Sequence, residues 1–581
     1  MKAPSQLVLV LSVLSLGVLL TFTYFNQWGE LFSNPDTVLL PYLIFRTLLR
    51  MLLAYSLVIL FAFPYGIIAG LYRRARFLML PLLDILQSIP VLGYLPAAIL
   101  FFVNILPGEL GYELASIFLI FTGMAWAVTF SIIGAVRNIP NDIREASNSF
   151  GMRGWRYVRH VVLPTIFPAF ITGSVLAWGG GWYFLVAAEL ISYGSVPHAL
   201  PGIGSYMGNA VFSQGNIASA IFGLILFIAV VYTINQTVWK PLIAYSKRFR
   251  IQTMESNAAV KFEPAEGKII DMFEWLMERK GGIDEFLARA FDRLGAFAST
   301  VKLPIRHIPR RRVHVPLPRW EVFSIYTGLF IGIMLLFAFF YASALAQQLR
   351  NIVHSISSYP DALNLPAYTF FSFLRILAAY LIALSWTMVA AILVTRSKRL
   401  YDLFLPVFDI GQSTPALALF PFIVVIVIQV LGGGTLSIEA ASILLLLTGT
   451  QWYLLFNIIG AIRHIPGDVL EASRAFGVRG KQFYRDILIP AIIPGILLGS
   501  IQAWGGAWNA LIVSEYIVFS SNTYSVQGLG AFLTRATLQP NPDPWIITLA
   551  VATMTLTVLL MNYLVWRPLF AYAEKYKFEG T

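Results

Sequence analysis

The fold is decided by a stretch that occurs twice in the chain, once at Glu145-Ala146-Ser147 and once at Glu471-Ala472-Ser473. In each copy three residues lead to a glycine, Gly151 or Gly477, and nine more lead to a second element. That second element is Val161-Val162-Leu163-Pro164 in the first copy and Ile487-Leu488-Ile489-Pro490 in the second. Since long apolar segments flank both copies, each is expected to be an inner loop between two membrane spans.

Local chemistry predicts that each copy folds as a rigid helical elbow. The elbows comprise residues 142–164 and 468–490. Asp142 and Glu145 are expected at the start of a helix, where carboxylates favour the positive end of the helix dipole. The small residues Ala146 and Ser147 keep this helix slim enough for a partner to approach closely.

Glycine and proline complete the elbow. Gly151 and Gly477 are expected to supply the sharp turn into a second short helix. Pro164 and Pro490 would then begin the next span, where a missing N–H has no consequence for the helix. Any loop between spans can contain glycine and proline, but this does not explain why the same pattern occurs at equivalent places in both halves.

The composition agrees with a membrane setting for these loops. The chain has 581 residues, of which 58% are hydrophobic and 12% charged, and its mean hydropathy is +0.73. A soluble chain of this length would need far more charge on its surface. Cysteine is absent, which excludes disulfides, thiolate metal sites and cysteine nucleophiles.

Long apolar runs, bounded by turn-forming and charged residues, predict twelve membrane spans. Six lie on each side of a charged insert. The first six are expected near 7–25, 42–71, 79–104, 114–136, 165–188 and 217–241. The second six are expected near 321–341, 367–394, 402–430, 438–461, 490–512 and 544–566. The first run is not closed by a small-residue cleavage site, so it is interpreted as a retained helix.

The distribution of basic residues predicts the orientation. With both termini in the cytoplasm, all Lys and Arg residues fall inside except Arg46, Arg50, Arg350, Arg375 and Arg535. The chain is therefore predicted to be a multi-pass protein of the cytoplasmic (inner) membrane.

The second half of the chain repeats the first. Asp84-Ile85-Leu86-Gln87-Ser88-Ile89-Pro90 returns as Asp409-Ile410-Gly411-Gln412-Ser413-Thr414-Pro415. Trp178-Gly179-Gly180 returns as Trp504-Gly505-Gly506. An even number of spans per repeat keeps both copies in one orientation, which predicts an all-α protein of two parallel six-helix halves, 1–242 and 320–581.

The segment between the halves, 243–319, is basic and is expected in the cytoplasm. Two amphipathic helices are predicted within it, the first near 269–277 and the second near 283–294. The following stretch, 306–319, resembles a basic tether to anionic headgroups. A solvated linker is the alternative, and nucleic-acid binding is not expected.

The repeated loop resembles the EAA loop of permease subunits of binding-protein-dependent ABC importers. That loop has Glu-Ala-Ala, three residues, Gly, nine residues and Ile-x-Leu-Pro. Here Ser147 and Ser473 replace the second alanine, Val161 replaces isoleucine and Ile489 replaces leucine, all with small changes in size. The segments from Asp84 to Pro90 and from Trp178 to Glu189 look like the nitrate/sulfonate/taurine branch of this family.

The resemblance implies a type I importer permease fold in which each elbow enters a cleft of a cytoplasmic ATPase subunit. The residues that it implies for this coupling are Glu145, Ala146, Ser147, Gly151, Leu163, Pro164, Glu471, Ala472, Ser473, Gly477, Ile489 and Pro490. The implied partners are two ATPase subunits, an extracytoplasmic binding protein and membrane lipid. The implied substrate is a small anion of the nitrate, sulfonate, taurine or bicarbonate class.

Catalysis is not expected of this chain itself. No Gly-x-x-x-x-Gly-Lys-Ser/Thr motif occurs in the sequence, so ATP and magnesium are expected to bind to the separate ATPase and no cofactor to this chain. Six histidines, none in a ligand-like pair, indicate no metal centre.

A few polar and small residues in the spans are candidates for the translocation path. They are Gln87, Ser88, Gln412, Ser413, Gly180 and Gly506. Close helix packing is the alternative role of the glycines. Glu189 and Glu515, near the outer ends of their spans, are assigned to gating or docking, with simple solvation as the alternative.

Two other classes of protein are compatible with a chain this hydrophobic. A twelve-span secondary transporter of the major facilitator type is also built from parallel six-span halves. It would need ionisable residues at mid-membrane for ion coupling and an acid and a glycine in the loop after span two, which is Leu71-Tyr72-Arg73-Arg74-Ala75-Arg76 here. A scaffold or insertase component would explain the hydrophobicity but not the paired elbows.

Overall fold

The structure is a computed structural model that describes residues 35–190, 200–249 and 354–573, except for 215, 415, 433, 464, 520–521 and 540–541. The predicted spans 7–25 and 321–341 lie outside the described residues. So do both predicted amphipathic helices and the basic tether of the segment 243–319.

Among the described residues, eight helices are long and apolar enough to cross a membrane. They are Leu40–Leu71, Glu109–Arg137, Gly154–Glu189, Ile217–Phe249, Pro360–Thr395, Thr435–Arg463, Gly480–Ser514 and Pro544–Leu569. Each coincides with one of the predicted spans. Many large apolar side chains on them are exposed, which suits a lipid environment.

The first half contains helices as follows: α3 (Pro35–Val38), α4 (Leu40–Leu71), α5 (Arg73–Ser88), η1 (Val91–Tyr94), α6 (Leu95–Ile105), α7 (Glu109–Arg137), α8 (Asn141–Ser149), α9 (Gly154–Tyr157), η2 (Val158–Val162), α10 (Leu163–Leu190), α11 (Ile203–Gly208), η3 (Asn209–Ser213), α12 (Ile217–Ile234), η4 (Asn235–Trp239), α13 (Lys240–Ser246) and η5 (Lys247–Phe249). The last membrane helix thus continues past the predicted end of its span at 241.

The second half contains η6 (Pro360–Asn364), α18 (Leu365–Thr395), α19 (Lys398–Ser413), α20 (Ala416–Leu431), α21 (Thr435–Arg463), α22 (Gly467–Ala475), α23 (Gly480–Phe483), η7 (Tyr484–Leu488), α24 (Ile489–Ser514), α25 (Leu529–Thr537), α26 (Pro544–Met561), η8 (Asn562–Trp566) and α27 (Arg567–Ala573). Strands β1 (Tyr516–Phe519) and β2 (Asn522–Ser525) form an antiparallel hairpin between α24 and α25. This hairpin is an addition to the predicted all-helical fold.

The third span of each half is not one helix, and the predictions of single spans at 79–104 and 402–430 were wrong in this respect. In the first half α5 ends at Ser88, and a short 3-10 segment precedes α6. Ile89 is extended, with φ −76° and ψ 121°, because the ring of Pro90 disfavours helical geometry in the residue before it. In the second half the gap between α19 and α20 contains Pro415 at the equivalent place.

Three long helices form the centre of each half. In the first half α7 packs against both α4 and α10, and in the second α21 packs against both α18 and α24. The repeat extends to the packing of aromatic rings. Tyr55, Trp178 and Trp239 contact one another in the first half, as the equivalent Tyr380, Trp504 and Trp566 do in the second.

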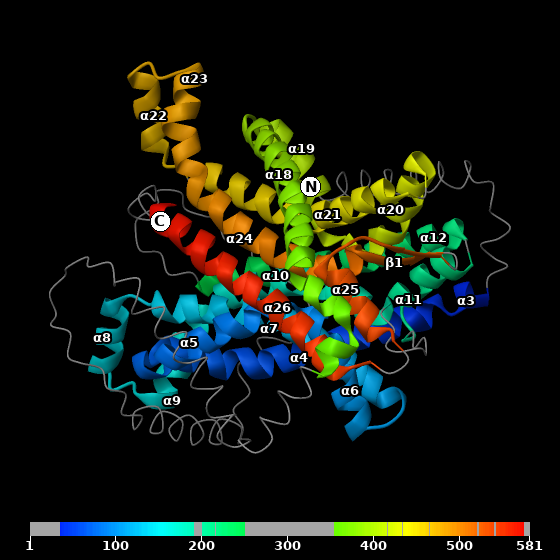
Figure 1. Ribbon diagram of the computed structural model, residues 1–581. Coiled ribbons are helices and arrows are strands. Elements are labelled where there is room, and N and C mark those ends of the chain that lie inside the picture. The colour runs from blue at the N-terminus through cyan, green and yellow to red at the C-terminus, as the bar shows by residue number, and fades with distance from the viewer. Residues whose placement is uncertain are drawn as a thin grey trace.

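Both elbows project from the same, left-hand side of the molecule in Figure 1, α8 and α9 at the lower left and α22 and α23 at the upper left. The short helices α11 and α25 lie away from them, to the right of the elbows. Each half therefore presents its elbow at one end and a short helix, α11 or α25, toward the other.

Candidate functional site: two elbows and a central cavity

The turn in the first elbow is set by the chain's own hydrogen bonds. Gly151 lies at φ +69°, in the left-handed region that glycine adopts without strain. Its N–H donates to the carbonyl of Asn148 at 3.0 Å, and the N–H of Met152 donates to the carbonyl of Ser147 at 2.9 Å. These two bonds form the Schellman motif, which ends α8 and satisfies its last carbonyl groups.

The second elbow has the same geometry. Gly477 also lies at φ +69°, its N–H donates to Arg474 at 3.1 Å, and the N–H of Val478 donates to Ser473 at 2.9 Å. The sharp turn predicted at both glycines is present. The starts of the second elbow helices, Gly154 and Gly480, also have positive φ, +54° and +56°. These two glycines were not among the residues predicted to form the turn.

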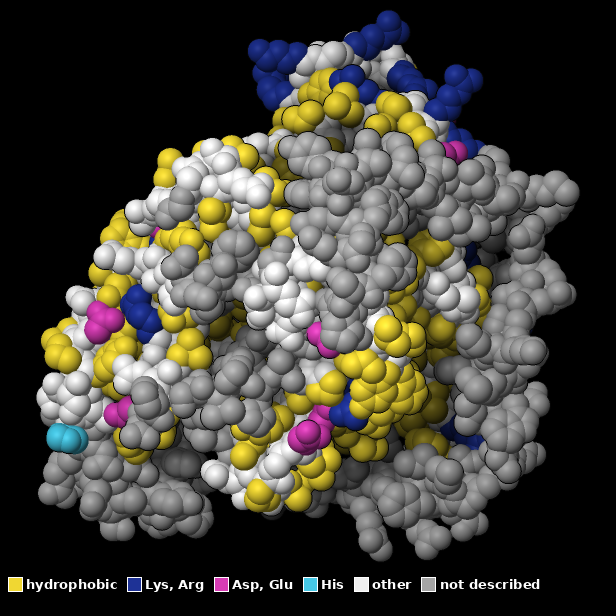
Figure 2. All heavy atoms as spheres, turned by 90° about the vertical axis from the view of Figure 1, so that its right-hand side faces the viewer, with side chains coloured by type: hydrophobic (Ala, Val, Ile, Leu, Met, Phe, Trp, Pro, Cys, Tyr) yellow, Lys and Arg dark blue, Asp and Glu magenta, His cyan; other side chains and the backbone are white. Residues whose placement is uncertain are grey.

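The surface of each elbow is partly apolar and partly basic. Phe150 is 79% exposed and its equivalent Phe476 is 85% exposed, each directly before the turn glycine. Figure 2 shows Lys and Arg side chains gathered at the top of the molecule, where the second elbow projects. The elbow's exposed basic residues are Arg474, Arg479, Lys481 and Arg485.

The predicted coupling residues lie on different faces of the elbow. Glu145 and Ala146 are exposed, as are Glu471 and Ala472. Ser147 is buried and its hydroxyl donates to the carbonyl of Ile143 at 2.6 Å, so it packs within the elbow. The equivalent Ser473 is buried in the same way and donates to Leu470.

Pro164 and Pro490 lie in the first turn of the α-helices α10 and α24, at the predicted place, but they do not begin the helical path of the span. The helix already begins at Gly154 in the first elbow and at Gly480 in the second, and it is continuous through the proline. A π-helical turn, η2 or η7, directly precedes Leu163 or Ile489. A wider turn at this point accommodates the missing N–H and the bulk of the ring inside a helix.

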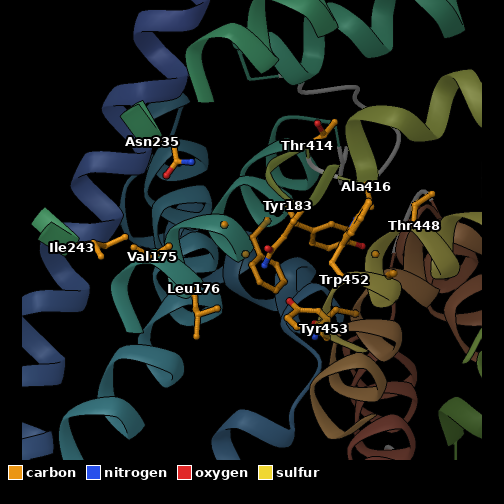
Figure 3. Close-up of a pocket in the computed structure, with 18 of the residues that line it drawn as sticks. Val175, Leu176, Tyr183, Asn235, Ile243, Thr414, Ala416, Thr448, Trp452 and Tyr453 are labelled. Carbon is orange, nitrogen blue, oxygen red and sulfur yellow. The ribbon is translucent and has the colours of Figure 1, made fainter. Parts of the chain in front are cut away.

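A cavity of about 350 Å³ lies between the two halves. Its lining comes from α10 and the η4–α13 segment of the first half and from α19, α20, α21 and α24 of the second. Figure 3 shows Tyr183, Trp452 and Tyr453 at its centre, with Asn235 and Ile243 on one side and Thr448 on the other.

Three of the six residues predicted for the translocation path line this cavity. They are Gly180, Gly506 and Gln412. Gln87 is exposed at the end of α5 and is not among the lining residues. Ser88 and Ser413 are the last residues of α5 and α19, and their side chains lie outside the described part of the structure.

The cavity wall is mainly apolar, with a few polar groups and one positive charge. Of the described residues that line it, Lys240 is the one charged residue. The hydroxyl of Tyr183 is buried and has no hydrogen-bond partner among the described residues. Asn509 occupies the position in the second half that Tyr183 occupies in the first, so the two walls differ chemically.

An ion-pair cluster lies at the other end of α10 from the first elbow. Arg50, 2% exposed, donates to Glu113 at 2.6 and 2.7 Å and to Glu189 at 2.8 Å. Arg46 also contacts Glu113, at 2.5 Å. We call Arg46, Arg50, Glu113 and Glu189 the first cluster. Glu189 is fully buried, so the alternative that it is simply solvated was wrong.

The second half contains an equivalent second cluster of Arg375, Glu439 and Glu515. Arg375 donates to Glu439 at 2.5 and 2.8 Å and also pairs with Glu515, which is fully buried. Phe371 stands where the first cluster has Arg46. The second cluster therefore has one arginine for two carboxylates.

Ion pairs explain how arginines can lie on the side of the membrane that the predicted orientation places outside. Every such arginine in the described part of the chain has an acidic partner. Arg46 and Arg50 pair with Glu113, Arg375 pairs with Glu439, and Arg535 lies 3.5 Å from Asp361. The charge distribution along the sequence marked these arginines as exceptions but did not indicate their partners.

Comparison with known proteins agrees with the duplicated architecture. The family described as "Binding-protein-dependent transport system inner membrane component" matches twice, over 62–238 and 383–567, which together make up more than half of the chain. Each match covers one elbow and two of the three central helices of its half, α7 and α10 in the first and α21 and α24 in the second.

Individual relatives match over about one third of the chain. The bicarbonate transport system permease protein CmpB of Synechococcus elongatus is 30% identical over 185 residues, 32% of this chain and 62% of that protein. The taurine transport system permease protein TauC of Escherichia coli is 29% identical over 181 residues, which are 31% of this chain and 63% of that protein. The nitrate import permease protein NrtB of Leptolyngbya laminosa is 27% identical over 179 residues, which are 31% of this chain and 59% of that protein.

The chain thus spans a little under two thirds of the length of these three relatives. The double match also sets aside the secondary transporter and the scaffold, because neither class carries this permease domain. The protein is a membrane permease component, and it belongs, with its domain present twice, to the family of binding-protein-dependent transport system inner membrane components.

Proposed function

We propose that this chain supplies both permease halves of an ABC importer that carries a small anion across the cytoplasmic membrane. An external binding protein delivers the anion, and two separate ATPase subunits bind the elbows 142–164 and 468–490 from the cytoplasm. The observation that carries the proposal is the pair of elbows, which share one turn geometry and project from one side of the molecule.

The chemistry of the cavity supports an anionic substrate. Lys240 supplies a positive charge, and the unpartnered hydroxyl of Tyr183 and the amide of Asn509 can donate hydrogen bonds. No carboxylate is among the described lining residues, so a passing anion would meet no repulsion there. The relatives named for bicarbonate, taurine and nitrate support a small substrate that carries an oxyanion group.

The fused architecture supports a particular stoichiometry. Since both halves and both elbows belong to one chain, one copy of the protein would serve two ATPase subunits. Both termini and the segment 243–319 would then lie in the cytoplasm, as the distribution of Lys and Arg indicates. ATP and magnesium would bind to the ATPase subunits.

The elbow glycines provide the test of this function. Valine at Gly151 and Gly477 would be held at positive φ, with a strain of about 1–3 kcal/mol at each site. The elbow turn would distort while the membrane helices stay intact. We expect the double variant Gly151→Val/Gly477→Val, in proteoliposomes with ATPase and binding protein, to lose uptake and to lose stimulation of ATP hydrolysis by the binding protein.

A matched control uses two glycines inside membrane helices. A Cβ at Gly134 or at the equivalent Gly460 would meet no atom of the described residues within 4 Å, and neither glycine has positive φ. The variant Gly134→Val/Gly460→Val should keep both activities. If the elbow variant inserts normally and still shows normal uptake and stimulated hydrolysis, the elbows are not the coupling elements.

A further inference from the structure

Glu189 joins three separate parts of the first half. One carboxylate oxygen accepts hydrogen bonds from Arg50 at 2.8 Å and from Thr47 at 2.7 Å, both on α4. The other accepts from the backbone N–H of Gly204 at 2.7 Å, in the first turn of the short helix α11. The hydroxyl of Thr47 also accepts from the N–H of Ile203 at 3.1 Å. Glu189 itself lies at the end of α10.

The second half repeats this arrangement. The carboxylate of Glu515 accepts hydrogen bonds from Ser372 at 2.7 Å and from the N–H of Gly530 at 2.8 Å. Ser372 accepts from the N–H of Leu529 at 2.9 Å, as Thr47 does from Ile203. Arg375 pairs with Glu515. The same bonds therefore hold α25 to α18 and α24.

The fit between acid and short helix is close in both halves. A Cβ at Gly202 would lie 2.1 Å from the carboxyl carbon of Glu189, and a Cβ at Gly528 would lie 2.1 Å from a carboxylate oxygen of Glu515. Both glycines directly precede the short helix that the acid binds. Only a residue without a side chain permits this approach, so each half is shaped around its buried carboxylate.

A single helix connects this contact to the elbow. The helical stretch from Gly154 to Glu189 begins in the first elbow, passes the cavity at Gly180 and ends at the carboxylate. At 1.5 Å per residue it spans about 52 Å. The stretch from Gly480 to Ser514 does the same in the second half and ends one residue before Glu515. A shift of an elbow along its helix axis would therefore reach the acid at the far end.

We propose that Glu189 with Arg50, and Glu515 with Arg375, are positioning residues that form two outer latches. Each latch holds its short helix, α11 or α25, against the outer ends of the long helices and keeps the outer side of the path closed. When an elbow moves, α10 or α24 transmits the movement to the latch at its far end. This connection links the outer side of the path to the ATPase. The part of this inference that concerns the ATPase rests on the proposed function, whereas the closure of α11 and α25 does not.

The first test needs the chain alone, without partners. The protein has no cysteine, so a single introduced cysteine can report on one helix. Met207 on α11 and the equivalent Leu533 on α25 are each 1% exposed. We expect Glu189→Gln to accelerate labelling of Met207→Cys by a membrane-impermeant maleimide in nanodiscs by at least about tenfold. Labelling of Leu533→Cys in the same background should stay slow.

The reciprocal variant and a control separate a latch from general loosening. Glu515→Gln should accelerate labelling at Leu533→Cys and leave Met207→Cys slow. Glu109→Gln, an exposed acid at the start of α7, should change neither. If Glu189→Gln accelerates both positions equally, or neither position, the proposal of two separate latches is overturned.

A milder pair of variants keeps the test decisive if the glutamine variants do not fold. Thr47→Val and Ser372→Ala remove only the hydroxyl between the acid and the short helix, and leave the ion pairs in place. Each should accelerate labelling of its own half by a smaller factor. Unchanged labelling in folded Thr47→Val and Ser372→Ala would overturn the proposal.

The link to the ATPase has its own measurement. In proteoliposomes with ATPase and binding protein, Glu189→Gln/Glu515→Gln should hydrolyse ATP faster than the parent without binding protein. Stimulation by the binding protein should fall at least about fivefold. A role in stability alone would lower hydrolysis instead of raising it. Faster labelling with normal stimulation would contradict the link while leaving closure and the elbow function in place.

Discussion

The backbone N–H of Val91 donates to the side-chain oxygen of Asn509, with 2.6 Å between the two atoms. Val91 begins η1, directly after the break in the third span of the first half, and Asn509 lies on α24 of the second half beside the cavity. The same amide donates to the carbonyl of Gly505 at 3.0 Å. One side chain thus fixes the non-helical break of one half against the wall of the other.

Two substitutions at Asn509 should separate this structural role from its place in the cavity. Asn509→Leu leaves the N–H of Val91 without its acceptor, a loss of about 1–3 kcal/mol, and should lower the thermal midpoint of the purified chain. Asn509→Asp keeps the acceptor but places a carboxylate in the cavity. It should keep the midpoint and reduce anion uptake in proteoliposomes. Equal effects of both variants on both measurements would contradict this division.

Lys240 should contribute to anion transport through its charge. A charged hydrogen bond contributes about 1.5–3 kcal/mol when it is shielded from water, and Lys240 is exposed, so a several-fold effect is expected. Lys240→Gln should reduce the initial rate of uptake by this factor, with a larger loss at low salt. Lys240→Arg serves as the control and should retain most of the rate. Normal uptake by Lys240→Gln at low salt would argue against the role.

Two equivalent glycines should respond differently to alanine. A Cβ at Gly123 would lie 2.1 Å from a ring carbon of Phe184, whereas a Cβ at Gly449 would lie 3.6 Å from the Cβ of Ala416. Gly123→Ala is therefore expected to destabilise the chain by about 1–3 kcal/mol through overpacking. Gly449→Ala should have little effect. Thermal unfolding in detergent measures both, and similar midpoints would refute the close contact between α7 and α10.

The exposed phenylalanines of the elbows should contribute to the affinity for the ATPase. Phe150 and Phe476 are largely exposed, so Phe150→Ser/Phe476→Ser should change the free energy of unfolding of the chain by no more than about 0.5 kcal/mol. Loss of two buried rings at an interface should weaken the complex at least tenfold. Co-purification with the ATPase at a series of concentrations measures this affinity. Phe150→Tyr/Phe476→Tyr keeps the rings and should bind like the parent.

The elbows could be predicted in detail because their structure is local. A Schellman turn needs one residue at positive φ and hydrogen bonds within six residues. Gly151 and Gly477 indicate this turn in the sequence. The long spans follow from hydropathy for the same reason. The continuous helix through Pro164 could not be anticipated, because it depends on a π-helical turn that has no clear sequence signal.

The ion-pair clusters depend on tertiary structure, and the sequence indicated only some of their residues. Arg50, Glu113 and Glu189 are separated by more than sixty residues each along the chain, so no local pattern joins them. The sequence did contain a signal, since an arginine within an apolar outer segment needs a partner. Pairing each such arginine with an acid on the neighbouring outer helix end would have identified Glu113 and Glu439.

Fusion of the two halves releases the cavity from the symmetry that two identical chains would impose. In a homodimer the position of Tyr183 would carry the same side chain on both walls, whereas here a phenol faces the path from α10 and an amide from α24. A substrate between them meets two different donors and can be held in one orientation. Each wall can also change by single mutations without altering the other, so a duplicated chain can acquire direction-dependent recognition that a homodimer cannot encode.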